Sequence, residues 1–290
     1  MNGIIVINKP SGYTSRDIVN IVSKKIGTKK IGHTGTLDPM ATGVLVLCVG
    51  SATKLVELIT DSYKEYVAEI TLGLLTDTLD SEGNIIKIDK KYISKEDIKN
   101  AIFSMKGKYI QEVPIYSAVK VNGKKLYEYA REGISIDLPK RLVEIKDIKL
   151  ISDIEYKEYI KFKIDTTVSK GTYIRSLVND IANKLGTVGI MSSLGRCKHG
   201  RFDIKDSYTI EDILNDNYKL LSIEDVLNDI YTIDMDDELY KKISNGVKIN
   251  NIYNKDMVLF KYNNKVIAIY KNDNGILKVY KMLFEGKIDN

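Results

Sequence analysis

Residues that build disulfide frameworks and zinc sites are scarce in this sequence. Its 290 residues include two cysteines and two histidines. Only Cys197 and His199 lie close together along the chain, which is too little for a four-ligand zinc site. The composition therefore excludes a disulfide-stapled fold and argues against catalysis by a bound metal ion.

Long hydrophobic runs are also missing. The longest, Val44 to Val49, is far shorter than the roughly 20 apolar residues that a membrane-spanning helix requires. The apolar run Ile4 to Ile7 has no basic residue before it, so it does not have the form of a secretory signal. From these absences we expect a cytoplasmic protein that does not associate with membranes.

No internal repeat or low-complexity segment interrupts the chain. With 43% hydrophobic and 29% charged residues, the composition is that of an ordinary globular protein. A length of 290 residues suggests two domains, since most domains contain about 100–200 residues.

The net charge of +5 is divided unevenly along the chain. Residues 1–56 carry seven Lys/Arg against two acids, residues 206–238 carry one against eleven, and residues 241–290 carry ten against four. Two interpretations of the basic ends remain open: ordinary solvated surfaces, or two surfaces that bind a phosphate backbone. Charge alone favours neither.

Hydrophobic periodicity predicts strands interspersed with helices in the first two thirds of the chain. Alternating apolar and polar residues mark a strand from Lys64 to Leu72, and apolar residues at helical spacing follow Ser15 and Ile174. Further elements are expected as strands at Gly3–Asn8, Gly43–Gly50, Arg141–Ile154 and Tyr159–Asp165, short helices at Lys54–Ile59 and after Ser94–Asp97, and a hairpin at Asn122–Gly123. The pattern indicates an α+β fold on a mixed, mainly antiparallel sheet with flanking helices.

The carboxy-terminal part predicts a second, smaller structure. The acidic residues around 206–230 fit one or two short helices, which we interpret as a joining segment. The strands expected beyond it are Met257–Tyr262, Lys265–Lys271 and Ile276–Phe284. Because turns rich in asparagine separate them, they indicate a small β-barrel. We therefore expect one domain over residues 1–230 and another over 231–290.

The segment GHTGTLDPMATG, residues 32–43, holds the most informative carboxylate. Three glycines and a proline give it an irregular backbone, and Asp38 is the only acid between Asp17 and Glu57. A lone acid in such a loop is either a functional group or the cap of an Asp-Pro turn, bonded to its own backbone. For this motif alone the turn is the commoner outcome, so the choice depends on other segments.

Those segments resemble the TruB family of tRNA pseudouridine synthases. GHTGTLDPMATG is similar to the catalytic motif of that family, and other family blocks follow it in the same order over residues 3 to about 210. The blocks are Lys9-Pro10, Lys64–Tyr66 (KEY), Thr76–Gly83 (TDTLDSEG), Val113–Gly133, Ser169–Leu177 (SKGTYIRSL) and Leu194–Phe202 (LGRCKHGRF). The carboxy-terminal domain resembles a PUA-type RNA-binding domain, over much shorter motifs.

The resemblance implies an isomerase that converts uridine to pseudouridine in the T loop of tRNA, at position 55, with Asp38 as the essential carboxylate. Breaking the glycosidic bond and remaking it at carbon 5 requires a carboxylate near the sugar and base and no cofactor. A glycosidase, by contrast, usually places two acids across the bond. Whether Asp38 attacks the sugar or the base, or acts through a glycal intermediate, remains open.

The resemblance also implies roles for other residues. Arg175 matches the guanidinium that would keep Asp38 ionised, and Tyr66 would stack on the flipped uridine and act as a general base. The implied substrate-binding residues are His33, which would help to displace the flipped base, Tyr173 beneath the site, Leu194 in the pocket wall, and Lys9 as a phosphate or structural contact. Without the resemblance, Arg175 would be interpreted as an exposed helix arginine.

Three activities are compatible with these motifs. The leading hypothesis is a monomeric, stand-alone enzyme that binds the T arm of tRNA and needs neither a guide RNA nor a protein partner. A guide-dependent, dyskerin-like synthase shares the catalytic motif, and a tRNA-binding folding chaperone would share the RNA contacts. The KEY, VPIYSA and KGTYIR blocks look more like the bacterial stand-alone form, and the set Asp38, Tyr66 and Arg175 favours an active enzyme.

Overall fold

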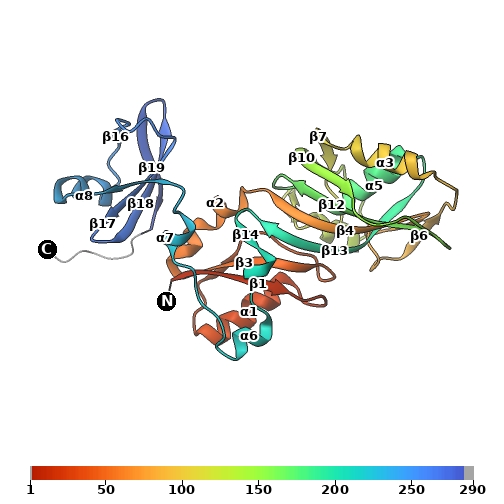
Figure 1. Cartoon of the computed structure of the whole chain (residues 1–290), viewed down its shortest axis with the longest axis horizontal. Helices are drawn as coiled ribbons and strands as arrows, with labels where there is room; N and C mark the ends of the chain where they lie inside the picture. Colours follow the sequence, from red (N-terminus) through yellow and green to blue (C-terminus); the bar gives the residue numbers. More distant parts are fainter. Residues whose placement is uncertain (1, 284–290) are drawn as a thin grey trace.

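The protein contains two large sheets that lie at opposite ends of the molecule (Figure 1). The computed structural model describes residues 2–283, so the end of the predicted carboxy-terminal domain, residues 284–290, lies outside the described part. The larger sheet comes from the first two thirds of the chain, and the smaller one, coloured blue, comes from residues 231–282. Within residues 2–283, no helix combines the length and apolar character needed to cross a membrane.

The larger sheet has ten strands, and its main path begins with the first strand of the chain. In spatial order, the path is β1 (Gly3–Lys9), β3 (Thr42–Val49), β13 (Gly189–His199), β4 (Lys64–Leu72), β12 (Ile160–Val168), β10 (Lys140–Leu150) and β7 (Gly107–Glu112). Short strands at its margins are β2 (Ile31–His33), β11 (Glu155–Tyr156) and β14 (Phe202–Asp203). Among the ladders that the described residues form in this sheet, β3 and β13 alone pair in parallel. The prediction of a mixed, mainly antiparallel sheet is confirmed.

Helices cover both faces of this sheet. One face packs against α1 (Ser15–Ile26), α3 (Lys95–Phe103), α5 (Ile174–Lys184) and α6 (Ile210–Leu214). The other face, at β1 and β3, packs against η1 (Gly50–Leu55), α2 (Val56–Thr60), α7 (Ile223–Val226) and the carboxy-terminal sheet. The remaining small elements are β5 (Leu74–Thr76), β6 (Ile85–Ile88), β8 (Lys120–Val121), β9 (Lys124–Lys125), α4 (Leu126–Arg131) and η2 (Ile204–Asp206).

Burial on both faces explains the unbroken apolar sequence of β1 and β3. Ile5 and Ile7 belong to the core under α1 and α5, whereas Ile4 and Val6 belong to the core shared with the carboxy-terminal sheet. Successive side chains of a strand point to opposite faces, so a strand with two cores has no polar face. Strand β4 alternates instead, with Tyr66, Ala68, Ile70 and Leu72 in a single core.

The helix predicted to follow Ser15 is confirmed, and caps fix both of its ends. The Thr14 hydroxyl accepts from the backbone N–H of Asp17, whose carboxylate accepts from the Thr14 N–H, which makes a capping box. Gly27 ends the helix at φ 76°, a left-handed conformation that costs glycine little. Elements with such terminal signals were therefore predictable from local sequence.

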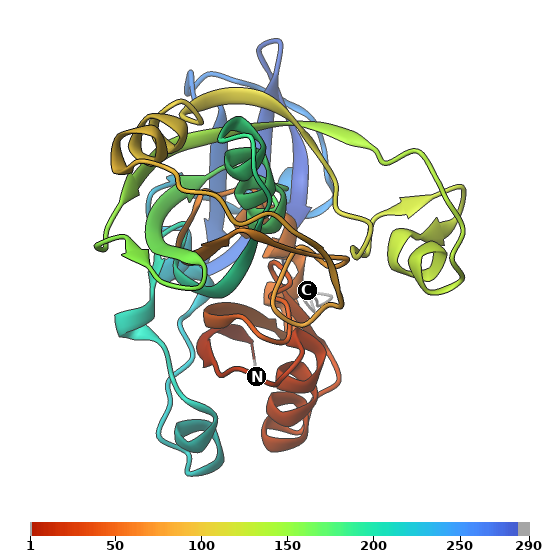
Figure 2. The ribbon, with the colours of Figure 1, turned by 90° about the vertical axis from the view of Figure 1, so that its right-hand side faces the viewer.

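Two local features follow regions that the sequence marked as loops or turns, and one of them differs from the expectation. β2 forms within the segment predicted to be irregular, because its backbone pairs with β3. The predicted hairpin at Asn122 is confirmed as β8 and β9, and α4 follows it directly. Figure 2 shows this yellow-green hairpin and helix projecting away from the main body.

The carboxy-terminal sheet contains the three predicted strands and two more. In spatial order it consists of β15 (Tyr231–Asp234), β17 (Met257–Tyr262), β18 (Lys265–Asp273), β19 (Ile276–Met282) and β16 (Ile249–Asn250), with α8 (Asp237–Ser244) beside it. The sheet curls as a barrel-like domain does, but within residues 231–282 no ladder joins β15 to β16. An ion pair of 2.7 Å between Lys281 and Glu57 adds to its apolar contact with the larger part.

Candidate active site

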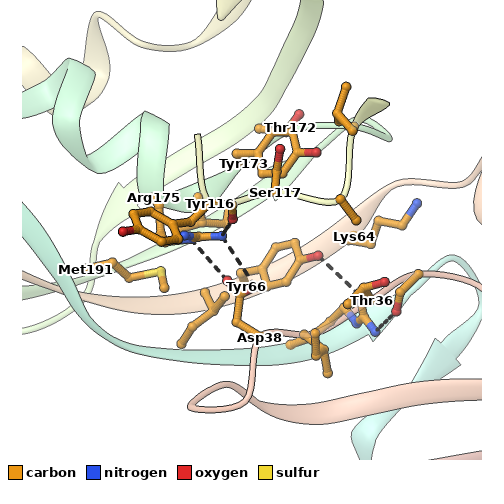
Figure 3. A pocket seen from close by; sticks show the side chains of 18 of the residues that line it. Thr36, Asp38, Lys64, Tyr66, Tyr116, Ser117, Thr172, Tyr173, Arg175 and Met191 are labelled. Carbon is orange, nitrogen blue, oxygen red and sulfur yellow. Dashed lines mark hydrogen bonds and ion pairs between the residues drawn. The ribbon is translucent and has the colours of Figure 1, made fainter. Parts of the chain in front are cut away.

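A pocket of about 650 Å³ opens beside the loop that follows β2. Its volume falls within the range of small-molecule sites. The wall comes from the 34–38 loop, the start of β4, the 116–119 segment, the 169–175 segment and β13. Asp38, Tyr66, Tyr173, Leu194 and Arg175 all line it, so the fold brings five of the seven predicted site residues together (Figure 3).

Asp38 and Arg175 form a bidentate ion pair at this pocket. Arg175 Nε lies 3.1 Å from Asp38 Oδ2, and Nη2 donates to Oδ1 at 3.4 Å. The Arg175 side chain is 7% exposed, whereas that of Asp38 is 35% exposed. Arg175 is therefore a buried support rather than an exposed helix arginine, and the carboxylate that it holds remains accessible from the pocket.

Other acceptors fix the Arg175 guanidinium in place. Nη1 donates to the Thr78 carbonyl at 3.1 Å, and Nη2 donates to the Tyr116 carbonyl at 3.0 Å. Nη1 also lies 3.6 Å from Asp80 Oδ2, on a side chain that is 9% exposed. The planar fork of an arginine suits this set of acceptors, which a lysine ammonium could not span.

The Asp-Pro turn considered for Asp38 also exists, in its backbone. The Asp38 carbonyl accepts from the Ala41 N–H at 3.0 Å, as in a turn. The carboxylate, however, is directed toward Arg175 and not toward its own backbone (Figure 3). The turn thus presents the side chain to the pocket, and the alternative in which the carboxylate caps its own backbone is not what the structure shows.

Arg196 is a buried residue that ties the 34–38 loop to the sheet. It is 1% exposed, and its guanidinium donates to the carbonyls of Val44 at 2.6 Å and Gly35 at 3.0 Å. Its Nη1 also donates to the Tyr66 hydroxyl at 3.4 Å. Gly43 lies against it at φ 100°, where a Cβ would come within 2.3 Å of the Arg196 carbonyl oxygen. The last glycine of the motif is therefore required by close backbone approach.

Lys9 and His33 do not line the pocket. Lys9 is fully buried, and its ammonium donates to the carbonyls of Pro10, Tyr13 and Pro39, while burial lowers its pKa to about 8. His33 is half-buried at the end of β2, and its Nδ1 has no hydrogen-bond partner in the described part of the chain. Burial, and next the charge of Arg16, lower the pKa of His33.

Sequence reasoning did not single out three residues that the structure places at the site. They are Arg196, Asp80 and Ser117. Each lies inside a family-like block, so position within LGRCKHGRF, TDTLDSEG and VPIYSA was the available signal. Among residues 2–283, no group of three or more His, Cys, Asp or Glu side chains is placed to hold a metal ion.

His199 bonds to Thr34 at the start of the 34–38 loop, and its burial makes the folding stability depend on pH. Its Nδ1 lies 3.2 Å from the Thr34 hydroxyl and its Nε2 lies 3.1 Å from the Ile59 carbonyl, so a neutral ring with a proton on Nε2 satisfies both. Burial lowers the pKa of His199 from 6.5 to about 3, and the charges of Arg196 and Lys64 add to this effect.

We expect His199 to make folding stability fall as the pH falls from 6.5 toward about 3. In that window the unfolded chain binds a proton that the folded chain does not, which lowers the free energy of unfolding by about 1.4 kcal/mol per pH unit near the middle. Urea unfolding of the wild type and a His199→Gln variant would measure it. The difference in stability between them should shrink in acid, and parallel curves would contradict the assignment.

Comparison with solved structures shows where this fold occurs. A chain of a Cbf5-Nop10-Gar1 complex superposes with a TM-score of 0.72 at 21% identity, covering 97% of this chain and 85% of that one. A chain of an H/ACA RNP bound to a substrate RNA gives 0.70 at 21% identity, covering 98% and 85%. At this identity the likeness extends to the fold alone.

Comparison of sequences identifies the class. The model of the TruB family pseudouridylate synthase, N-terminal domain, matches residues 23–174, which include Asp38 and Tyr66. Fold, site and this match define a pseudouridine synthase, an isomerase. Since the match spans more than half of the 290 residues, the chain belongs to the TruB family.

Relatives matched over most of their length agree with this membership. The tRNA pseudouridine synthase B of Clostridium kluyveri is 45% identical over 251 residues, covering 86% of each chain. That of Bacillus subtilis is 47% identical over 216 residues, covering 73% of this chain and 70% of the relative. That of Lactobacillus delbrueckii subsp. bulgaricus is 41% identical over 277 residues, covering 92% and 93%.

Proposed function

We propose that this protein isomerises a uridine in the T loop of tRNA, at position 55, without a guide RNA. The observation that carries the proposal is the Asp38 carboxylate, exposed to a nucleotide-sized pocket and held by the buried Arg175. Relatives that are 41–47% identical bear the name tRNA pseudouridine synthase B, which supports tRNA as the substrate.

The pocket supplies what the rearrangement requires. The bond between the ribose C1′ and the uracil N1 breaks, a bond from C1′ to carbon 5 forms, and carbon 5 loses its proton. Asp38 is the carboxylate beside the reacting sugar and base, and Arg175 holds it in place by a bidentate ion pair. The Tyr66 ring offers a face for the flipped base, and its hydroxyl is the nearby general base, while Tyr173 and Leu194 enclose the base.

Two residues take roles outside the pocket. Lys9 holds the segment around Pro39 by bonding to three carbonyls, so it positions the Asp38 loop rather than binding phosphate. His33 lies beside that loop with an unpartnered Nδ1, in a place where it can occupy the gap left by the flipped base.

Residues 231–290 form an RNA-binding, PUA-like domain joined to the catalytic domain of residues 1–230. The curled sheet supports this role. So does the positive charge of residues 241–290, which contain ten basic and four acidic residues. The domain packs against the face of β1 and β3 that lies opposite α1 and α5. Because this contact holds the domain in one position, the domain extends the RNA-binding surface of the larger part. We propose that the enzyme acts as a monomer.

Tritium release tests this proposal. A bare tRNA transcript with tritium at carbon 5 of its uridines is incubated with the purified protein, because tritium leaves only when carbon 5 is bonded to the ribose. We expect release stoichiometric with the tRNA, and none from a transcript with cytidine at position 55. Equal release from both transcripts would refute the T-loop target. Binding without release would favour a guide-dependent synthase or a chaperone.

A further inference from the structure

A chain of hydrogen bonds outside the pocket joins strand β7 to helix α5. Gln111 is 1% exposed, and its side-chain amide bonds twice to the backbone of Tyr173. Nε2 donates to the Tyr173 carbonyl at 3.1 Å, and Oε1 accepts from the Tyr173 N–H at 2.8 Å. The same Nε2 donates to the Tyr109 hydroxyl at 2.7 Å, which in turn donates to Asp180 at 3.0 Å. Such a fully bonded buried amide resists displacement.

Gln111 and Tyr109 contact α5 at two points. Asp180 follows Tyr173 by seven residues, about two helical turns, so the two points lie about 10 Å apart along the helix axis. Tyr109 and Gln111 are two residues apart on β7 and share one face of that strand. Strand β7 therefore holds α5 at two positions along the helix axis. Two such contacts fix both the rotation of the helix and its position along the axis.

A third bond strengthens the same contact. The Ser176 hydroxyl, in the first turn of α5, donates to the Glu112 carbonyl of β7 at 2.8 Å. Tyr173 is the N-cap residue of α5, with an extended backbone at φ −98° and ψ 116°, and its own side chain makes no capping bond. The backbone at the start of this helix is thus held by the strand.

Arg175 depends on the place where α5 begins. It is the second residue of the helix, two positions after Tyr173. Its bonds to Thr78, Tyr116 and Asp38 are all between 3.0 and 3.4 Å. A slide of α5 by a fraction of a turn would therefore take the guanidinium out of reach of the Asp38 carboxylate.

We propose that Tyr109, Gln111 and Asp180 form a clamp that positions Arg175 against Asp38 for the isomerisation. The clamp rests on the proposed function, because it acts on the ion pair of that site. None of the three side chains lines the pocket, so each is a positioning residue and makes no contact with the RNA.

Single-turnover tritium release with Tyr109→Phe and Gln111→Leu tests the clamp. Displacement of a catalytic group by about 1 Å can cost 100-fold, so we expect rates about 10- to 100-fold lower in both variants. The Kd for tRNA should stay at the wild-type value, since the RNA-contacting surface is intact. Unchanged rates, or a loss confined to tRNA binding, would overturn the proposal.

A double-mutant cycle separates positioning from general destabilisation. If Tyr109 acts through Arg175, Tyr109→Phe should change the rate by less than about twofold when Arg175 is already lysine. An equal loss in both backgrounds would mean that the hydroxyl acts independently of Arg175, and would refute the clamp.

A matched control is available in the carboxy-terminal sheet. The Tyr270 hydroxyl is buried and donates to the carbonyls of Ile243 and Val247 at 3.2 Å, so Tyr270→Phe removes a comparable hydroxyl far from β7. It should lower the Tm without lowering the rate, and a rate loss matching that of Tyr109→Phe would overturn the clamp. No release by any protein, the wild type included, would instead refute the proposed function together with the clamp.

Discussion

Replacing Asp38 by asparagine is expected to abolish pseudouridine formation while leaving tRNA binding within a few fold of the wild type. The amide keeps the size of the side chain and can still accept from Arg175, but it has neither the charge nor the nucleophilicity of a carboxylate. Removing a group that takes part directly in bond making lowers rates by factors on the order of 10⁴ or more. Single-turnover tritium release and filter binding would measure the two effects.

Asp80→Asn serves as the matched control for this prediction. Asp80 also faces Arg175, at 3.6 Å, but its side chain is 9% exposed and does not line the pocket. Its substitution should reduce the rate far less than that of Asp38. If the two asparagine variants lost activity equally, or if Asp38→Asn retained activity, the assignment of Asp38 as the essential carboxylate would fail.

Replacing Arg175 by methionine is expected to produce the second largest loss. The variant removes the only side chain that bonds to Asp38 in the described part of the chain, and loss of one preorganised donor typically lowers rates about 10²- to 10³-fold. It also leaves Asp80 without its ion pair, which should reduce the free energy of unfolding by about 3 kcal/mol. Single-turnover rates and urea unfolding would measure both quantities.

Arg175→Lys distinguishes charge from geometry. Lysine keeps the positive charge, but its single ammonium cannot reach Asp38 and the carbonyls of Thr78 and Tyr116 together. We therefore expect the lysine variant to recover much of the stability and little of the rate. Wild-type activity in this variant would show that charge alone suffices, and would contradict the role given to the forked pairing.

Elements with a strong local signal were predictable from sequence. Strand β4 was predicted at its observed bounds, and α1 begins at Ser15 as predicted, because alternation and helical spacing are properties of neighbouring residues. The pairing partners of short strands were harder to predict from the sequence. Strand β2 has three residues, and its strand conformation depends on β3, which begins nine residues later.

Some features of the site were likewise indicated by the sequence, whereas others depend on the tertiary structure. Asp38 is the one acid of a rigid glycine-rich loop, but only the family-like blocks favoured a functional role over a turn cap and indicated Arg175 as its partner. That the two side chains meet, across a separation of 137 residues, is decided by where β7 and the sheet place α5. Burial of Lys9 among three carbonyls had no local signal either, since its short motif is compatible with phosphate binding as well.

The sequence by itself indicated the family, the longer strands and helices and the carboxylate that we propose for the chemistry, because these follow from the family-like blocks and from periodicity over a few neighbours. Only the tertiary structure decided that Arg175 is buried, that Arg196 ties the loop to Tyr66, and that β3 and β13 run parallel. The physical reason is that such contacts join distant segments. Their geometry results from packing the whole sheet and its helices at once, which no short stretch of the chain encodes.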